Sequence, residues 1–370
     1  MKKLNQSINP TQSGGEKKNA NNLYIFLLTL ICIISLILDV ILSRNTLFIP
    51  LILSLGLTII STQFTYQKLK SLKLKQIIRR EGPKKHYKKS GTPSMGGIAV
   101  IPISLLVGNL FNINNESSLK LLTLSILSLS FMLIGLIDDW RSFSLKKNLG
   151  LSPKEKIVLQ CIAAIVFLLT CASNNWINPN IYIYGDYMIK LGLLIWPVAL
   201  FILIAESNAT NLTDGLDGLA SGCGSIVFTG LSIELVFQGS NESYAMASFC
   251  MAMAGSWLGF LLHNKNPAKI FMGDTGSLAM GASLAGISLI TNTLWSLLIM
   301  GIIFLIESIS VIIQVGFFKI SKKLRGQGHR ILKMAPLHHH FELNGQNEIK
   351  IVRNFWFITI NFVILKLLFL

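Results

Sequence analysis

The sequence predicts an all-α fold: a polytopic membrane helix bundle of about ten to eleven transmembrane helices, with a polar site on its cytoplasmic face. Of the 370 residues, 51% are hydrophobic and only 14% are charged, whereas soluble proteins contain about 25% charged residues. The mean hydropathy is +0.57. Apolar stretches recur along the whole chain, and each is long enough to cross a hydrocarbon core of about 30 Å. A soluble enzyme with a single anchor is therefore excluded.

Each apolar stretch is expected to form one span. Residues 1–22 precede the first stretch, are polar and rich in Asn, Gly and Lys, and are expected to form a disordered cytoplasmic tail. Residues 23–370 are expected to form one integral membrane domain, because no linker is long enough to separate two globular units. The expected spans are 23–43, 47–65, 95–112, 120–137, 157–172, 188–205, 218–237, 244–262, 277–291, 293–318 and 354–370.

The positive charges set the orientation. Segment 68–89 contains ten Lys or Arg residues and one acid, Glu81, which is typical of a cytoplasmic loop. Counting spans outward from it places the N-terminus on the same side and the C-terminus outside. The net charge of +16 is attributed to such loops and to anionic lipid headgroups. Nucleic acid is not an expected partner, because no basic module with interleaved aromatic residues is present.

The unusual polar motifs all fall on this cytoplasmic side. A transporter would place polar groups near the bilayer midplane and is often built from internal repeats, and no clear repeat is present. The clustering favours an enzyme at the membrane surface, with a lipid or solute transporter as the alternative from another class. The motifs are KKSGTPSMGG (88–97), DDWRSFSLKKNLG (138–150), ESNATNLTDGLDG (206–218), HNKNPAKIFMGDTGS (263–277) and APLHHHFE (335–342).

Carboxylates dominate two of these motifs. Asp138 and Asp139 end an apolar run, where acids oppose the helix dipole and raise each other's pKa. A nearby cation or a phosphate-bound Mg²⁺ would offset both effects. Asp274 lies in a glycine-containing turn that opens a helix, which is a natural place for a phosphate. Asp274 is therefore a candidate ligand of a divalent ion that bridges phosphates.

The turn NLTDGLDG adds Asn211, Asp214 and Asp217, whose side chains can ligate Mg²⁺ or hydrogen-bond a nucleoside. An Asx-rich turn that caps the next helix is the structural alternative.

The run His338–His340 is a weak zinc motif, because consecutive residues rarely supply three ligands to one tetrahedral ion. Near a pyrophosphate these imidazoles are better interpreted as hydrogen-bond donors. Glu307 and Gln314 lie inside an apolar span, where polar residues serve function or a structural contact with another helix or with the backbone.

Together these features favour Mg²⁺-assisted transfer of a phospho-group from a soluble anionic donor to a lipid acceptor. The sequence strongly resembles the polyprenyl-phosphate N-acetylhexosamine-1-phosphate transferase superfamily. The Asp138–Asp139 pair, NxxNLTDGLDGLA (Asn208–Ala220) and FMGDTGS mark the superfamily. GTPSMGG (Gly91–Gly97) and APLHHHFE mark the branch with a muramoyl-pentapeptide donor. The resemblance extends from about Gly82 to the C-terminus.

The resemblance implies the first membrane step of peptidoglycan synthesis in a bacterial plasma (inner) membrane. UDP-N-acetylmuramoyl-pentapeptide and undecaprenyl phosphate would give lipid I and UMP, with Mg²⁺ as cofactor. A homodimer would agree with the family's usual state, although no residue indicates it. A sister enzyme that transfers N-acetylglucosamine-1-phosphate is the alternative, and the histidine run argues against it.

The resemblance also implies roles for residues. Asp274 would ligate Mg²⁺, and Asp138, beside Asp139, would deprotonate the lipid phosphate before its direct attack on the donor. Because a carboxylate beside Mg²⁺ is a weak base and the phosphate is already largely ionised, orientation or a second metal contact is the alternative role for Asp138. His338 and His339 belong to the essential histidine motif, and His340 is assigned to the substrate site. The uridine and diphosphate pocket would contain Asn208, Asn211, Asp214, Asp217, Asn264 and Phe271, with Lys89 and Lys146 near the phosphates.

Two departures from the family pattern stand out. The family usually has a lysine three residues after the second Asp, where this chain has Ser142 beside Arg141. The phosphate contact is therefore expected to come from Arg141 or to be weaker. The stretch 23–43 is also one span more than the ten that the family usually has.

Overall fold

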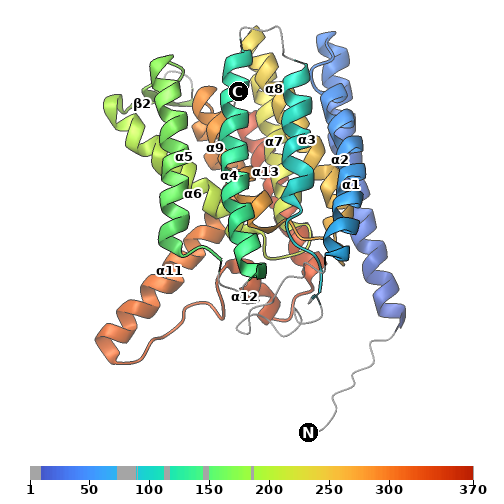
Figure 1. Cartoon of the computed structure of the whole chain (residues 1–370), viewed down its shortest axis with the longest axis vertical. Coiled ribbons are helices and arrows are strands. Elements are labelled where there is room, and N and C mark those ends of the chain that lie inside the picture. The colour runs from blue at the N-terminus through green and yellow to red at the C-terminus, as the bar shows by residue number, and fades with distance from the viewer. Residues whose placement is uncertain are drawn as a thin grey trace.

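The computed structural model of the chain is an all-α bundle with one small β-hairpin, which confirms the predicted fold class (Figure 1). The structure describes residues 10–72, 89, 91–111, 117–144, 150–184 and 187–369, with the backbone alone for 10–14 and 184. The helices are α1 (Pro10–Leu42), α2 (Phe48–Ser71), α3 (Gly97–Leu110), α4 (Ser118–Ser144), α5 (Pro153–Ser173), α6 (Ile195–Thr213), α7 (Leu219–Gln238), α8 (Asn241–Asn264), α9 (Gly273–Ile290), α10 (Leu294–Met300), α11 (Ile302–Arg325), α12 (Leu337–Leu343) and α13 (Glu348–Leu367).

Every expected span overlaps a helix. By length and hydropathy, eight helices in the described part of the chain can cross a membrane: α1, α2, α4, α5, α6, α7, α8 and α11. The eight are fewer than the ten or eleven expected. Helix α3 has only 14 residues, α9 begins with the polar sequence GDTGS, and α13 contains Glu348, Lys350, Arg353 and Lys366. The extra N-terminal span is present as α1.

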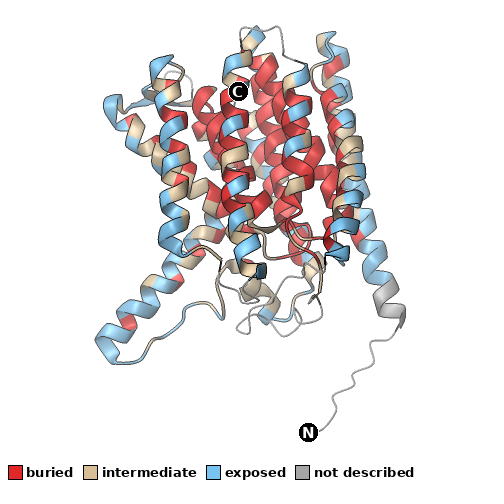
Figure 2. Cartoon of the chain, in the orientation of Figure 1, coloured by how far each residue is buried: buried red, intermediate tan, exposed pale blue. Residues whose placement is uncertain are grey.

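The bundle is layered around a centre of α7, α8 and α9, which are almost wholly buried (Figure 2). Only 22–28% of the apolar stretches of the flanking helices α1, α2, α5, α6 and α11 is buried, and the other positions are intermediate or exposed, as expected for helices that face lipid (Figure 2). Small residues let the central helices approach their neighbours closely. A Cβ atom on Gly281 of α9 would lie 2.4 Å from the Glu206 carbonyl oxygen of α6, so only glycine fits there.

Three expectations about element boundaries were wrong. Helix α1 begins at Pro10, so the disordered tail expected over 1–22 is contradicted from residue 10; residues 1–9 lie outside the described part. The expected span 188–205 begins in a strand, because β1 (Asn180–Tyr184) and β2 (Tyr187–Lys190) form an antiparallel hairpin before α6. The expected span 293–318 is two helices, α10 and α11, which separate at Gly301.

The sequence segments that carry the polar motifs meet at one end of the bundle, near α12 (Figure 1). Backbone hydrogen bonds join the segment 93–97 to the segment 271–272: Phe271 N donates to Pro93 O at 2.8 Å, and Gly96 N donates to Phe271 O at 2.9 Å. Helices α3 and α9 also touch through glycine, since a Cβ on Gly97 would lie 2.3 Å from the Gly276 nitrogen. The structure thus brings motifs that are far apart in the sequence onto one face, as predicted.

Candidate active site

Three carboxylates converge where α4 ends and α9 begins. Asp138 and Asp139 lie near the end of α4, and Asp274 is the second residue of α9. One carboxylate oxygen from each lies within 4.8 Å of the other two. Gly135 makes this approach possible, because a Cβ there would lie 2.1 Å from the Asp274 carbonyl oxygen. We call Asp138, Asp139 and Asp274 the aspartate cluster.

Asp139 holds the first turn of α9. Its Oδ1 accepts a hydrogen bond from Asp274 N at 3.3 Å, and its Oδ2 accepts from Thr275 N at 3.1 Å and Thr275 Oγ1 at 2.6 Å. The first backbone N–H groups of a helix lack partners within that helix, and the helix dipole favours a negative charge beside them. Asp139 therefore acts as an N-terminal cap supplied by a different helix.

Asp138 is oriented by the segment that follows α4. Its Oδ1 accepts a hydrogen bond from Leu151 N at 2.9 Å. A Cβ on Gly150 would lie 2.4 Å from Asp138 Oδ2, so the backbone can pass beside the carboxylate only at a glycine. The Asp138 side chain is thereby directed at the other two carboxylates.

Asp274 is the carboxylate with the most side-chain contacts. Lys156 Nζ of α5 lies 2.5 Å from its Oδ2, and Asn211 Nδ2 of α6 donates to its Oδ1 at 2.7 Å. Asn211 also donates to Ser277 Oγ at 2.9 Å. Asp274 thus connects α9 to α5 and α6.

Sequence reasoning missed Lys156. The feature that could have identified it is its place in the first turn of the helix that follows the Asp-Asp motif.

The charge of the cluster is unbalanced. Among the described residues one ammonium group, that of Lys156, pairs with one of the three carboxylates, Asp274. Asp138 and Asp139 have no paired cation in this part of the chain. Carboxylate oxygens are the ligands that Mg²⁺ takes from proteins, so the donor set fits this ion.

Asp214, the residue after α6, lies nearby. Burial raises its pKa to about 8, with further increases from the charges of Asp274 and Asp139.

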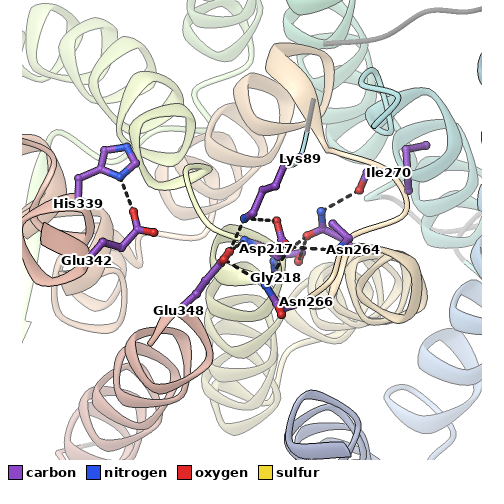
Figure 3. A network of polar contacts seen from close by, with 11 residues as sticks. Lys89, Asp217, Gly218, Asn264, Asn266, Ile270, His339, Glu342 and Glu348 are labelled. Carbon is purple, nitrogen blue, oxygen red and sulfur yellow. Dashed lines mark hydrogen bonds and ion pairs between the residues drawn. The ribbon is translucent and has the colours of Figure 1, made fainter. Parts of the chain in front are cut away.

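A second polar group lies in the same face and is shown in Figure 3. Lys89 Nζ contacts Asp217 Oδ1 at 2.7 Å and Glu348 Oε1 at 2.6 Å. Asn266 Nδ2 donates to both carboxylates at 3.1 Å, and Asp217 N donates to Glu348 Oε1 at 2.8 Å. We call Lys89, Asp217, Asn266 and Glu348 the Lys89 network. It joins the turn 214–218, the segment after α8 and the start of α13.

The two carboxylates of the Lys89 network favour the charged form of Lys89, whereas burial and Asp217 disfavour the charged form of Glu348. Burial lowers the pKa of Lys89, but Glu348 and Asp217 raise it, so the pKa lies above its ordinary value. Burial raises the pKa of Glu348, as does Asp217, and Lys89 partly offsets this increase. The pocket residues Lys89 and Asp217 predicted from the sequence thus pair with each other.

The remaining predicted pocket residues connect neighbouring segments. Asn264 accepts from Gly218 N at 3.1 Å and Ser221 Oγ at 3.0 Å, and donates to Ile270 O at 3.0 Å (Figure 3). Asn208 donates to Gln160 Oε1 at 2.9 Å. Phe271 contributes the backbone pairing with the segment 93–97. Lys146 lies outside the described residues.

The three histidines have different partners. His338 Nδ1 lies 3.1 Å from Glu307 Oε2, and both side chains are fully buried. His339 Nδ1 lies 2.8 Å from Glu342 Oε2 (Figure 3). His340 Nδ1 accepts a hydrogen bond from Lys333 N at 3.1 Å.

The intramembrane residues Glu307 and Gln314 serve different contacts. Gln314 accepts from Ile331 N and Leu332 N at 3.1 and 3.0 Å, and so holds the segment before α12. This is the backbone role considered for it from the sequence.

The expected contribution of Arg141 is not seen at the cluster. Arg141 Nη1 lies 3.4 Å from Glu155 Oε1, in an ion pair whose side chains are about half exposed. The ammonium group beside the aspartate cluster belongs instead to Lys156.

Comparison with known proteins agrees with these motifs. The family model described as Glycosyl transferase family 4 matches residues 121–292. A protein of Prochlorococcus marinus (strain SARG) is 59% identical over 98% of both chains. A second protein, from Prochlorococcus marinus (strain NATL2A), is 50% identical over 100% of this chain and 99% of its own. A third, from Synechococcus sp. (strain CC9311), is 49% identical over 88% of each chain. All three are named phospho-N-acetylmuramoyl-pentapeptide-transferase.

Proposed function

The chain belongs to the phospho-N-acetylmuramoyl-pentapeptide transferase family, and we propose that the aspartate cluster is its reaction centre. The protein is a multi-pass membrane transferase that moves phospho-N-acetylmuramoyl-pentapeptide from its UDP donor to a lipid carrier, forming lipid I and releasing UMP. We propose undecaprenyl phosphate as the carrier, and the cytoplasmic side of a bacterial inner membrane as the face that contains the cluster.

One observation carries the assignment of the reaction centre. Three carboxylates from two helices lie together, and among the described residues one of them, Asp274, pairs with an ammonium group. The excess negative charge is what a divalent cation would neutralise. We propose that Asp274 and Asp138 ligate Mg²⁺ while Asp139 holds the turn that presents Asp274. When bound, Mg²⁺ would neutralise the donor phosphates and align the attack.

The step itself is a substitution at phosphorus. An oxygen of the lipid phosphate forms a bond to the β-phosphorus of the donor, and the bond from that phosphorus to the bridging oxygen breaks, so that UMP leaves. Lys156 is placed to balance charge beside Asp274. Because Asp138 accepts a backbone hydrogen bond and would lie beside Mg²⁺, both of which make a carboxylate a weaker base, we propose that it orients the metal and phosphate rather than acting as a base.

The donor pocket is proposed to lie beside the cluster. Asn211 and Asp214 border the cluster directly, whereas Asp217 and Asn264 hold the turn between α6 and α7 in place. His338, His339 and His340 lie in α12, at the end of the bundle where the segments with the polar motifs meet. That this protein forms a homodimer, as is usual in the family, stays a prediction.

A turnover assay tests the function. The purified protein in detergent is supplied with undecaprenyl phosphate, Mg²⁺ and UDP-N-acetylmuramoyl-pentapeptide, and UMP release is measured with UDP-N-acetylglucosamine as a parallel donor. We expect release from the muramoyl donor alone, and its loss on chelation of Mg²⁺. Release from the glucosamine donor alone would assign the sister activity, and a folded protein that releases no UMP from either donor would favour transport.

A further inference from the structure

The carboxylate assigned as a metal ligand is also the one that already contacts a cation. Lys156 Nζ of α5 lies 2.5 Å from Asp274 Oδ2, and the two side chains are 15% and 24% exposed. Asn211 Nδ2 donates to the other oxygen, Oδ1, at 2.7 Å. Both oxygens of Asp274 therefore have a donor. A divalent cation that binds Asp274 has to share an oxygen atom with one of these donors or displace it.

The ammonium group is the donor that a divalent cation displaces more easily. A neutral amide and a cation can approach one carboxylate together, but two cations on one oxygen atom repel each other. Asn211 is also held by a second hydrogen bond, which its Nδ2 donates to Ser277 Oγ at 2.9 Å. The contact with Asp274 is the one hydrogen bond that the Lys156 side chain makes to described residues. Displacing the ammonium group therefore breaks one contact, whereas displacing the amide breaks two.

Lys156 combines a fixed backbone with a flexible side chain. Ser152 and Glu155 form a capping box at the start of α5, which holds the first turn of the helix in place. The helix dipole favours negative charge in this turn, so the positive charge of Lys156 is offset by Asp274 rather than by its own helix. The four-carbon stem of lysine is flexible. The ammonium group can therefore leave Asp274 Oδ2 without a movement of α5.

We propose that Lys156 competes with the divalent cation for Oδ2 of Asp274, so that Lys156 sets the cation concentration at which the aspartate cluster is filled. The inference rests on the proposed function, because it takes Asp274 as a metal ligand. The ammonium group keeps Asp274 directed at the other two carboxylates until the cation replaces it on Oδ2. A competing lysine also makes the cation bind more weakly, and exchange more readily, than the three carboxylates alone would allow.

Direct binding of Mn²⁺ tests the competition without turnover. Mn²⁺ shares the preference of Mg²⁺ for carboxylate oxygens, and electron paramagnetic resonance of the free ion gives its Kd for the purified protein in detergent. Lys156→Met removes the ammonium group and retains most of the side-chain length. Unit charges in contact interact strongly, and the partial exposure of both side chains weakens this interaction, so we expect Lys156→Met to lower the Kd by about tenfold or more.

A matched control comes from the same turn of the same helix. Lys154 is exposed and forms no ion pair with any described residue. Lys154→Met removes the same charge by the same substitution, and we expect it to change the Kd by less than about twofold. Asp274→Asn removes the shared carboxylate charge and is expected to weaken Mn²⁺ binding by about tenfold or more, which identifies the cluster as the site that is titrated.

A structure of the Mn²⁺-loaded protein separates displacement from simple repulsion between charges. Removing a nearby positive charge would strengthen cation binding even if Lys156 never left Asp274. Displacement predicts in addition that Mn²⁺ contacts Asp274 Oδ2 and that Lys156 Nζ lies beyond the ~4 Å limit of an ion pair with that oxygen.

Three results would overturn the inference. The first is an unchanged Kd in folded Lys156→Met. The second is an equal decrease of the Kd in Lys154→Met, which would indicate a general effect of positive charge. The third is a Mn²⁺-loaded structure in which Lys156 Nζ still contacts Asp274 Oδ2. If Lys156→Met does not fold, Lys156→Gln gives the decision.

Failure of the proposed function is recognised separately. Equal Mn²⁺ binding by Asp274→Asn and the wild type would remove the metal site, and the inference with it. A wild type that binds Mn²⁺ through Asp274 but releases no UMP would instead contradict the proposed activity and leave the competition at Asp274 standing.

Discussion

The aspartate cluster and the Lys89 network lie in the same face of the bundle and are built from the same residue types, but their charges are arranged differently. In the network, one lysine lies between two carboxylates, and amide and backbone donors satisfy the remaining oxygens. In the cluster, three carboxylates lie together and the described residues supply one ammonium group.

The difference separates a scaffold from a binding site. Carboxylates that share a site disfavour one another's ionised form, so the cluster is destabilising unless a cation joins it. The deficit of the Lys89 network is smaller, one cation for two carboxylates, and both carboxylates contact that cation. The network connects the segments at residues 89, 214–218 and 266–268 to α13. Carboxylates that lack a contacting cation therefore indicate where a ligand belongs, whereas carboxylates that share a cation and hydrogen-bond donors indicate how the pocket is held.

The largest effect should follow from removing a carboxylate of the cluster. Asp274→Asn is expected to lower UMP release by about 10³-fold or more, since metal stabilisation of a transition state is worth several kcal/mol and each 1.36 kcal/mol is a factor of ten. Stability of the metal-free protein should not fall, because one like charge is gone. Glu155→Gln is the control, as glutamine can keep the capping box at the start of α5. Equal activity of Asp274→Asn and Glu155→Gln would contradict the metal assignment.

The opposite pattern is expected in the Lys89 network. Lys89→Met leaves Asp217 and Glu348 without their cation and should destabilise the fold by about 2–4 kcal/mol, below the value for a fully buried pair because the Lys89 side chain is 20% exposed. The measurement is thermal unfolding in detergent. Adding Glu348→Gln to Lys89→Met should recover part of the loss. An unchanged unfolding temperature for Lys89→Met would show that the network is not a scaffold.

The pH dependence of stability should report the burial of Asp214 beside the cluster, to which the cluster's negative charge adds. The pKa of Asp214 is raised from 3.8 to about 8 in the folded protein, so the folded state binds the proton more tightly than the unfolded state. Stability of the metal-free protein should therefore fall as pH rises from about 4 towards about 8. Asp214→Asn should flatten this dependence in thermal unfolding measured across that range. A dependence of equal steepness in Asp214→Asn would assign it to other groups.

The smallest effect is expected at Arg141. Its ion pair with Glu155 is about half exposed, and solvent-exposed pairs of this kind contribute little to stability. Arg141→Gln should change both stability and UMP release by less than about threefold. A large loss of activity would instead show that Arg141 replaces the lysine that the family has at position 142.

The sequence alone determined the class of the molecule and the composition of its site. Apolar segments of membrane length predicted the helices, and the Asp-Asp, NLTDGLDG and FMGDTGS motifs identified residues that the fold does bring together. Both signals are local, since each lies within one segment. Local patterns also mislead where two structures share one pattern: the polar start of α1 has the composition of a tail, and the apolar run across Gly301 has the composition of a single helix.

Tertiary structure alone decided the partners of the charged residues. Lys156 contacts Asp274 across 118 positions of the chain, and Lys89 contacts Glu348 across 259. The pairing of Glu307 with His338 likewise depends on how α11 and α12 meet. Such contacts depend on helix packing, which is governed by side-chain volume and by glycines such as Gly135 and Gly215 that permit close approach. The sequence therefore named the charged groups, and packing decided which of them are paired and which remain for a ligand.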